Sequence, residues 1–256
     1  GFAMADETAA RAMGWIEAHL EVKSMNQYWY SAATISAMVR VIRVHFLKDP
    51  PAEGPRLRCA LVSTPSLFFA LEPAERAGCR VLDIDENLKD GAPDQFVMYD
   101  FHRPWDLPAE LKGAFAAVVI DPPFITRDVW ELYAEAARFL LPAAGGLVLA
   151  STVIENAPMM KELLACEPNA FLPSIPNLPY QYALYTNFPA PELAARNEEV
   201  PVNPEEFLER RDAAANPREA EAPVQGAGDA YDFEKMLDDA MRRSSELGVA
   251  GPPPTR

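Results

Sequence analysis

The residue types that methyl transfer to an amino nitrogen requires occur together in one turn, Asp121-Pro122-Pro123-Phe124. The turn follows the apolar run 115–120 and precedes a segment of helical pattern, which places it at the end of a buried parallel strand. Asp121 and the carbonyl of Pro122 can each accept one N–H hydrogen bond, and Phe124 offers an apolar wall whose face favours a cation. The two prolines fix φ, so we expect both acceptors to be held before a substrate arrives.

Acidic residues also end two other predicted strands. Asp83 and Asp85 are two residues apart and therefore point to the same side, where one of them is well placed to bind the hydroxyls of a ribose. At the end of the next strand, Asp100 can accept a hydrogen bond from an adenine amine and Phe101 can stack on its ring. Together these acids predict a site for S-adenosylmethionine as methyl donor.

The turn after the first predicted strand argues against this prediction when it is taken alone. It reads Ser63-Thr64-Pro65-Ser66 and lacks the glycine-rich pattern that normally lets a nucleotide approach the backbone. Small hydroxyl residues can take the place of glycine there, and Ser66 is also expected to cap the following helix.

Short apolar strands alternate with helical segments through the middle of the chain. The expected strands are 57–63, 80–85, 96–101, 115–120, 146–151 and 181–185, and the expected helices between them are 66–78, 127–141 and 158–166. This alternation predicts an α/β fold with a mostly parallel sheet covered on both faces. Ligands in such sheets bind beyond the carboxyl ends of the strands.

Two helices are expected before this region, within residues 5–48. The first covers 5–24, with its apolar face at Met13, Ile16, Leu20 and Trp15. The second begins at the N-cap Ser31 and has an apolar stripe of helical spacing, with Arg40 and Arg43 facing away from it.

The domain organisation follows from a change of composition near residue 189. Residues 56–188 form the predicted catalytic domain, and residues 189–256 form an acidic tail rich in Pro and Ala that we expect to be largely disordered. An amphipathic stripe near 231–247 predicts a helix in this tail. The pattern fits docking on the protein's own surface and recognition of a partner.

The overall charge constrains the partner and the compartment. A formal net charge of −15 disfavours nucleic acid, whose affinity comes from Lys and Arg, and favours a basic protein. The cysteines Cys59, Cys79 and Cys166 fit buried thiols in a reducing compartment and have no zinc-ligand spacing. No apolar run reaches the length of a membrane span, so we expect a cytoplasmic protein without a metal site.

Several of these motifs occur in the order found in a known family. They are Gln27-Tyr28-Trp29-Tyr30-Ser31, the turn 62–66, Tyr99-Asp100-Phe101, Asp121-Pro122-Pro123-Phe124, Asn177-Leu178 and Tyr185-Thr186-Asn187-Phe188. With them, residues 8–188 resemble the eukaryotic elongation factor 1-alpha lysine methyltransferases, formerly labelled as adenine-specific DNA methyltransferases. This family shares a turn containing serine and proline after the first strand.

The resemblance implies a Rossmann-like, seven-strand methyltransferase sheet, S-adenosylmethionine as donor, and a lysine of elongation factor 1-alpha as acceptor. It makes residues 121–124 the catalytic turn and makes Tyr28, Trp29, Tyr30 and Asn177 candidates for binding the substrate. Two alternatives stay open from the residues themselves. One is an adenine amino-methyltransferase acting on DNA or RNA, and the other is a non-catalytic binding module with the same fold.

Overall fold

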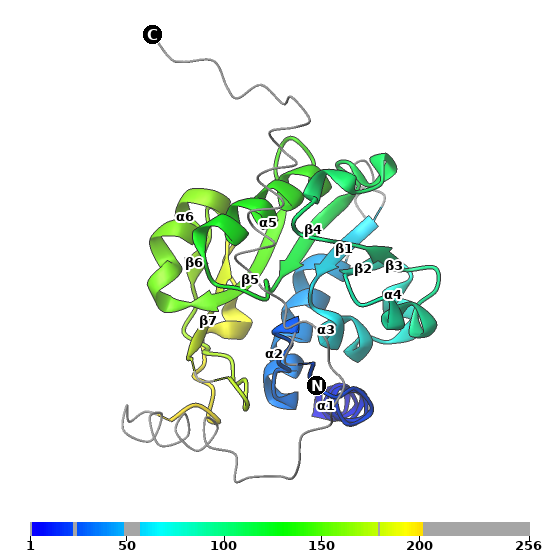
Figure 1. Cartoon of the computed structure of the whole chain (residues 1–256). Helices are drawn as coiled ribbons and strands as arrows, with labels where there is room; N and C mark the ends of the chain where they lie inside the picture. Colours follow the sequence, from blue (N-terminus) through cyan, green and yellow to red (C-terminus); the bar gives the residue numbers. More distant parts are fainter. Residues whose placement is uncertain (1, 23–24, 49–56, 179, 202–256) are drawn as a thin grey trace, which may run out of the picture. The chain divides into compact units, whose positions relative to one another are not determined.

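The computed structural model describes residues 2–22, 25–48, 57–178 and 180–201. Their centre is a seven-stranded sheet with the order β3-β2-β1-β4-β5-β7-β6 (Figure 1). The strands are β1 (Leu57–Val62), β2 (Cys79–Asp83), β3 (Phe96–Met98), β4 (Phe115–Ile120), β5 (Leu147–Val153), β6 (Glu167–Pro168) and β7 (Tyr182–Thr186). The first five are parallel, whereas β7 runs antiparallel to both of its neighbours. This arrangement confirms the predicted seven-strand methyltransferase sheet.

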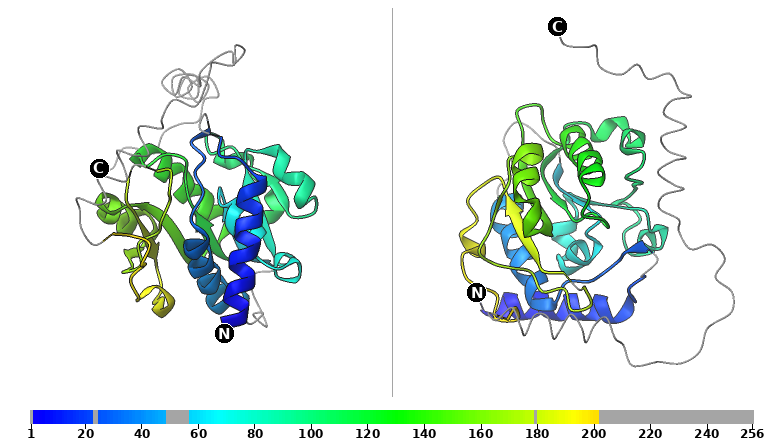
Figure 2. Two further views of the ribbon diagram at one scale, coloured as in Figure 1. Left: turned by 90° about the horizontal axis from the view of Figure 1, so that it is seen from below. Right: turned by 60° about the vertical axis from the view of Figure 1, so that its left-hand side comes forward.

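Helices cover both faces of the sheet. The α-helices are α1 (Phe2–Ala18), α2 (Ala32–Val41), α3 (Pro65–Ala70), α4 (Pro73–Arg76), α5 (Arg127–Leu140) and α6 (Ala157–Leu164). The helix α2 continues as the π-helical segment η2 (Ile42–Leu47). One buried cluster joins α1, α2 and α3 to one face of the sheet, and a second joins α5 and α6 to the other. Figure 2 shows α1 lying alongside α2 from two further directions.

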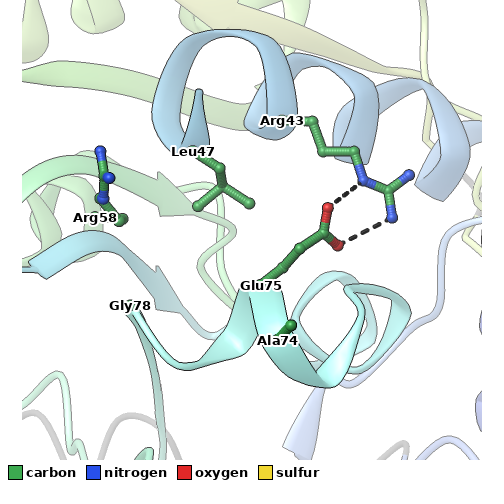
Figure 3. Close-up of a pocket in the computed structure, with 6 residues that line it drawn as sticks. All are labelled: Arg43, Leu47, Arg58, Ala74, Glu75 and Gly78. Atoms are coloured by element: carbon green, nitrogen blue, oxygen red, sulfur yellow. Dashed lines mark hydrogen bonds and ion pairs between the residues drawn. The ribbon is translucent and has the colours of Figure 1, made fainter. Parts of the chain in front are cut away.

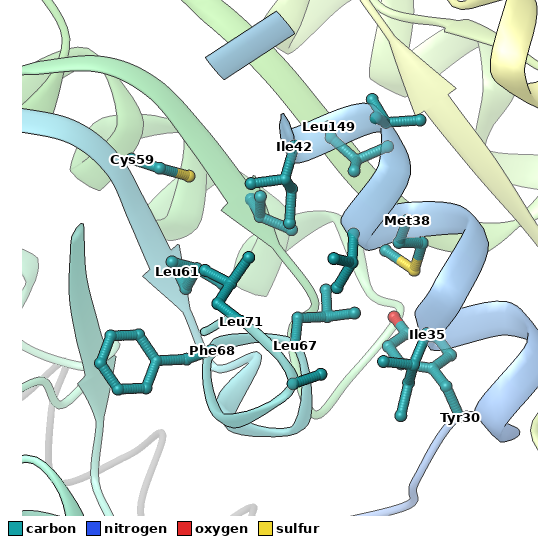
Figure 4. Packing of buried hydrophobic residues seen from close by; sticks show 14 of the residues in the cluster. Tyr30, Ile35, Met38, Ile42, Cys59, Leu61, Leu67, Phe68, Leu71 and Leu149 are labelled. Carbon is teal, nitrogen blue, oxygen red and sulfur yellow. The ribbon is translucent and has the colours of Figure 1, made fainter. Parts of the chain in front are cut away.

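The second helix forms as its sequence predicts. The Ser31 side chain caps α2 by accepting a hydrogen bond from the Thr34 backbone N–H at 3.1 Å. Ile35, Met38 and Ile42 are fully buried against the sheet (Figure 4). Arg43, which was expected to face away from this stripe, turns towards α4 and forms an ion pair with Glu75 at 2.6 Å.

The apolar face predicted for the first helix was wrong in part. The side chains of Met13 and Leu20 are 52% and 86% exposed, and α1 ends at Ala18, before Leu20. Among the residues of this helix whose side chains are described, Thr8, Ala12 and Trp15 are buried, because the face that packs on α2 and α3 is rotated from the one expected.

The turn after β1 also differs in detail from the prediction. Thr64, and not Ser66, occupies the N-cap position of α3, and Ser66 is buried inside the helix. The segment expected as one helix, 66–78, is interrupted before Pro73, since α3 ends at Ala70 and Pro73 begins α4. A proline has no N–H to donate and is therefore tolerated in a first helical turn.

The packed part of the chain continues beyond the expected boundary at residue 188. The short 3₁₀ helix η7 (Pro191–Leu193) and the buried residues Leu193, Asn197 and Val200 belong to it. The amphipathic helix predicted near 231–247 lies outside the described residues. Within the residues that the structure describes, no helix is long and apolar enough to cross a membrane.

Candidate active site

Four polar residues stand side by side at the carboxyl edge of the sheet. The backbone register pairs Val62 with Leu82 and with Ile120, and pairs Ile120 with Ala150. The next residue along each strand is Ser63 after β1, Asp83 at the end of β2, Asp121 after β4 and Ser151 within β5. The parallel sheet therefore brings together residues from four strands in one row.

The Asp121 carboxyl in this row is largely removed from water. Burial raises the pKa of its carboxyl to about 7, and the nearby hydroxyl of Tyr30 opposes the rise by favouring the ionised form. Tyr30 is only 2% exposed, and its pKa is raised by burial and by the Asp121 charge. Among the described residues, neither the Tyr30 hydroxyl nor the Ser151 hydroxyl has a hydrogen-bond partner in good geometry.

The turn of residues 121–124 is held in place by a hydrogen bond from a residue that the sequence analysis did not single out. The Asn26 side chain donates a hydrogen bond to the carbonyl of Pro123 at 2.8 Å. Asn26 has φ of 53°, a left-handed conformation that asparagine tolerates better than most residues. That tolerance was the only sequence signal for this role.

The aromatic residues beside the turn form a continuous wall. The ring centroids of Phe101 and Phe124 are 6.2 Å apart, and those of Phe101 and Tyr133 are 5.8 Å apart. The Tyr133 hydroxyl lies 2.7 Å from the hydroxyl of Ser63, so α5 is tied to the turn after β1. The sequence analysis predicted only that Tyr133 lies in the helix expected over 127–141, and it assigned no role to its hydroxyl.

The turn after β1 has the backbone geometry of a glycine-containing turn, although it has no glycine. Ser63 has φ of 56°, in the left-handed region that costs other residues energy and that glycine adopts freely. Thr64 is 2% exposed, and its hydroxyl is buried without a hydrogen-bond partner among the described residues. Such strain and such unpaired groups are typical of ligand sites.

The structure distinguishes the two acids that follow the second strand. Asp83 is 6% exposed, and burial raises the pKa of its carboxyl to about 6. Asp85 is the N-cap of the 3₁₀ helix η3 (Glu86–Gly91), where its carboxyl accepts from the Asn87 backbone at 3.1 Å and side chain at 2.7 Å. Asp83 is therefore the better candidate for the ribose.

The predicted adenine contacts lie in the turn after β3. The carboxyl of Asp100 accepts from the His102 backbone at 3.0 Å and lies 2.8 Å from its ring. The hydrogen bond with the His102 side chain lowers the pKa of Asp100. This carboxyl already holds its own turn, so the contacts of Asp100 and Phe101 with adenine stay predictions.

The three neighbouring aromatic residues Tyr28, Trp29 and Tyr30 do not point to one place. The Trp29 ring packs 4.8 Å from Trp15 and donates to the His19 carbonyl at 2.8 Å, so it is held against α1. The Tyr30 hydroxyl lies near Asp121, and Tyr28 lies near Tyr182. Burial raises the pKa of Tyr182, and the nearby Asp121 and Tyr28 raise it further, which places Tyr182 with them.

A surface hollow lies elsewhere, at the amino ends of β1 and β2. Figure 3 shows its lining residues, which are Arg43, Leu47, Arg58, Ala74, Glu75 and Gly78. Arg43 and Glu75 form a bidentate ion pair across it, with N–O distances of 2.6 and 3.0 Å. This hollow contains none of the residues of the carboxyl-edge row.

The comparison with known protein families identifies the family of the chain. Residues 21–190 match the family described as "Probable N6-adenine methyltransferase". The chain belongs to this family. The match includes the whole carboxyl-edge row and the segment that carries Asn26 and Tyr30.

Curated relatives of this methyltransferase chain are named as protein-lysine enzymes. A protein-lysine N-methyltransferase of Caenorhabditis elegans is 29% identical over 181 residues, covering 68% of this chain and 82% of its own. EEF1A lysine methyltransferase 1 of Mus musculus is 28% identical over 167 residues, covering 64% and 73%. A protein-lysine N-methyltransferase of Saccharomyces cerevisiae is 30% identical over 126 residues, covering 46% and 47%.

The carboxyl edge fits the methyl donor of this family. The buried hydroxyls of Tyr30, Thr64 and Ser151 make no hydrogen bond of good geometry in the described part of the chain, and Asp83 offers a carboxyl at the same edge. S-adenosylmethionine carries ribose hydroxyls, an amine and a carboxylate that can pair with such groups. Among the described residues, no group of His, Cys, Asp and Glu side chains could hold a metal ion.

Proposed function

We propose that this chain is an S-adenosylmethionine-dependent protein-lysine N-methyltransferase whose substrate is elongation factor 1-alpha. The observation that carries the proposal is the position of Asp121, which follows β4 directly and stands in one row with Ser63, Asp83 and Ser151 at the carboxyl edge of the sheet. The names of the relatives support a protein substrate. The net charge of −15 supports a basic partner and disfavours nucleic acid.

The side chains around Asp121 favour the neutral form of the substrate amine. Lysine in water is neutral in only about one molecule in a thousand at pH 7, because its pKa is about 10.4. A lysine that enters between Tyr28, Tyr30 and Tyr182 loses water, which lowers the pKa of its amine. The bound donor supplies an electrophilic methyl group on a sulfonium, whose positive charge disfavours an ammonium ion beside it.

Asp121 then orients the amine rather than acting mainly as its base. Its carboxyl accepts one N–H, and the Pro122 carbonyl accepts another, so the nitrogen lone pair is directed away from both acceptors. The hydrogen bond from Asn26 to Pro123 keeps these two acceptors in register. An ionised carboxyl also stabilises ammonium, and this effect opposes deprotonation.

The donor and substrate assignments extend to individual residues. We assign Ser63, Thr64, Pro65, Ser66, Asp83, Asp100 and Phe101 to the donor, with Asp85 as the cap of η3. Tyr28 and Tyr30 are assigned to binding of the substrate lysine. Trp29 and Asn177 are assigned a supporting role, because they hold the segments that carry Tyr28 and Tyr30. Cys59, Cys79 and Cys166 are free thiols, which supports a cytoplasmic location.

The experiment is a transfer assay with a labelled donor and three acceptors. Purified elongation factor 1-alpha, a DNA oligonucleotide and an RNA oligonucleotide are each incubated with the enzyme, and the protein product is digested for mass spectrometry. We expect label on a lysine of the elongation factor alone. Label on adenine alone would establish the nucleic acid alternative, and donor binding without transfer to any acceptor would establish a binding module.

A further inference from the structure

Several large apolar side chains are exposed where the segments around the catalytic turn meet solvent. Leu20 is 86% exposed, Tyr180 58%, Ile154 49% and Val22 38%. None of them helps to form the buried clusters on the two faces of the sheet. We call these four residues the rim patch.

Hydrogen bonds connect residues 20–22, which include two residues of the rim patch, to the segment that leads to Tyr180. Glu21 stands between Leu20 and Val22, and its carboxyl accepts from the Asn177 side chain at 2.8 Å and from the Trp29 backbone at 2.9 Å. Residues 20–22 therefore lie beside the segment that leads to Tyr180.

The sheet brings Ile154 to the same place as Tyr180. Val153 of β5 is paired with Tyr182 of β7 in antiparallel register. Ile154 comes one residue after this pair and Tyr180 two residues before it, so both leave the same end of the two strands. Tyr182 is close enough to Asp121 for the Asp121 charge to raise its pKa, although burial is the larger cause.

The catalytic turn is attached to the same frame. Asn26, four residues after Val22, donates to Pro123 at 2.8 Å. The segments that carry the rim patch are therefore connected, through hydrogen bonds and strand pairing, to the turn of Asp121. Exposed apolar side chains that gather at a site mark an interaction surface, whereas single ones scattered over a protein are ordinary.

We propose that the rim patch is the docking surface for the protein that carries the substrate lysine, a folded basic protein with an apolar contact beside that lysine. The proposal rests on the proposed function. Charge complementarity selects this occupant, since the chain has 38 acidic and 23 basic residues and Glu17 and Glu155 are exposed next to the patch. The same charge opposes pairing with a second copy of the chain or with an anionic membrane.

The test compares two double variants of the full chain. Leu20→Ser with Tyr180→Ser removes apolar surface from the rim patch, and Met13→Ser with Val44→Ser removes two other exposed apolar side chains, which are 52% and 41% exposed. KM for folded elongation factor 1-alpha, kcat and the Kd for S-adenosylhomocysteine are measured for each. Melting temperature monitors folding.

The rim variant is expected to raise KM about tenfold while kcat and the Kd for S-adenosylhomocysteine change less than twofold, because contacts remote from the reacting atoms affect binding uniformly. The control variant should leave all three constants unchanged. An unchanged KM in the rim variant, or an equal rise in the control, overturns the proposal.

A direct binding measurement separates this proposal from the proposed function. The affinity of each variant for elongation factor 1-alpha is measured in the presence of S-adenosylhomocysteine, without any transfer step. If the wild-type chain transfers no methyl group, the proposed function fails, and binding still decides the role of the rim patch. A rim variant that binds about tenfold more weakly than the control supports the patch, and equal affinity or no binding by the wild type contradicts it.

Discussion

The two edges of the sheet differ in how completely their polar groups are paired. At the amino edge, Arg43 donates to both carboxyl oxygens of Glu75 and to the Thr8 hydroxyl at 2.7 Å. At the carboxyl edge, the buried hydroxyls of Tyr30, Thr64 and Ser151 make no hydrogen bond of good geometry among the described residues.

This difference indicates that the carboxyl edge, and not the amino edge, is the ligand site. Buried polar groups in folded proteins are nearly always hydrogen-bonded, so unpaired ones point to a missing partner. The carboxyl edge also contains the left-handed Ser63 and two carboxyls whose pKa values are raised by burial, those of Asp83 and Asp121. Groups of this kind cluster at functional sites. The hollow at the amino edge has an open shape, but its central charges already neutralise each other.

The largest effect expected at the carboxyl edge comes from Asp121→Ala. Loss of this preorganised acceptor should lower kcat/KM for elongation factor 1-alpha by about a hundredfold, in line with the loss of one such group in other enzymes. The Kd for S-adenosylhomocysteine should change little, because the change removes an acceptor for the amine. Steady-state kinetics and calorimetry check this, and wild-type kcat/KM in the variant would show that Asp121 is not part of the site.

The second effect separates Asp83 from Asp85. Asp83→Asn should weaken binding of S-adenosylhomocysteine about tenfold, since a hydrogen bond to a charged group contributes about 1.5–3 kcal/mol. Asp85→Asn is the matched control, because it changes a carboxyl that caps η3. Calorimetry measures both, and a greater loss of affinity in the Asp85 variant would reverse the assignment.

At the amino edge the effect should be on stability alone. Arg43→Met removes the hydrogen bonds to Glu75 and Thr8, which should lower the free energy of unfolding by about 2 kcal/mol. Burial acts to raise the pKa of Glu75, but the Arg43 hydrogen bond helps to lower it overall, so this stabilisation is present at neutral pH and is lost as pH falls. Urea denaturation measures the change, and kcat/KM at a temperature where the variant is folded should equal that of the wild type. A large loss of kcat/KM would break the contrast between the edges.

The smallest expected effect is a shift in the pH profile of Tyr30→Phe. The Tyr30 hydroxyl lowers the pKa of Asp121 from the value that burial alone would give. Without it, the pKa of Asp121 rises above about 7, and the acidic limb of kcat/KM moves to higher pH. Tyr185→Phe is the control, because that hydroxyl donates to the Val153 carbonyl at 2.9 Å and does not face Asp121. A limb that stays in place in the Tyr30 variant would mean that the two groups are not coupled.

The sequence predicted the fold well, because strands and helices depend on local patterns. The apolar run before Asp121 determines where β4 ends, and its predicted bounds are those of the structure. Asp83 and Asp121 follow directly from strand ends. The left-handed φ of Ser63 was not predicted. The sequence showed only that the turn after β1 lacks glycine, and not which residue would adopt the left-handed conformation in its place.

Contacts between distant segments could not be read from the sequence. Asn26 meets Pro123 across 97 residues, and Tyr133 meets Ser63 across 70, and neither pair has a local pattern that marks it. The same limit explains the first helix, where helical periodicity allowed a face with Met13 but packing against α2 and α3 selected Ala12 and Trp15. Trp29 could not be separated from Tyr28 and Tyr30 for the same reason, since its position depends on Trp15 and His19.

The most direct test of the carboxyl edge as the active site is a crystal structure of the chain with S-adenosylhomocysteine. We expect the ribose hydroxyls to bind the Asp83 carboxyl and the sulfur to face the turn of Asp121 and Pro122. A nucleoside bound in the hollow beside Arg43 and Glu75, or any position that leaves the Asp121 turn out of reach of the sulfur, would contradict this expectation.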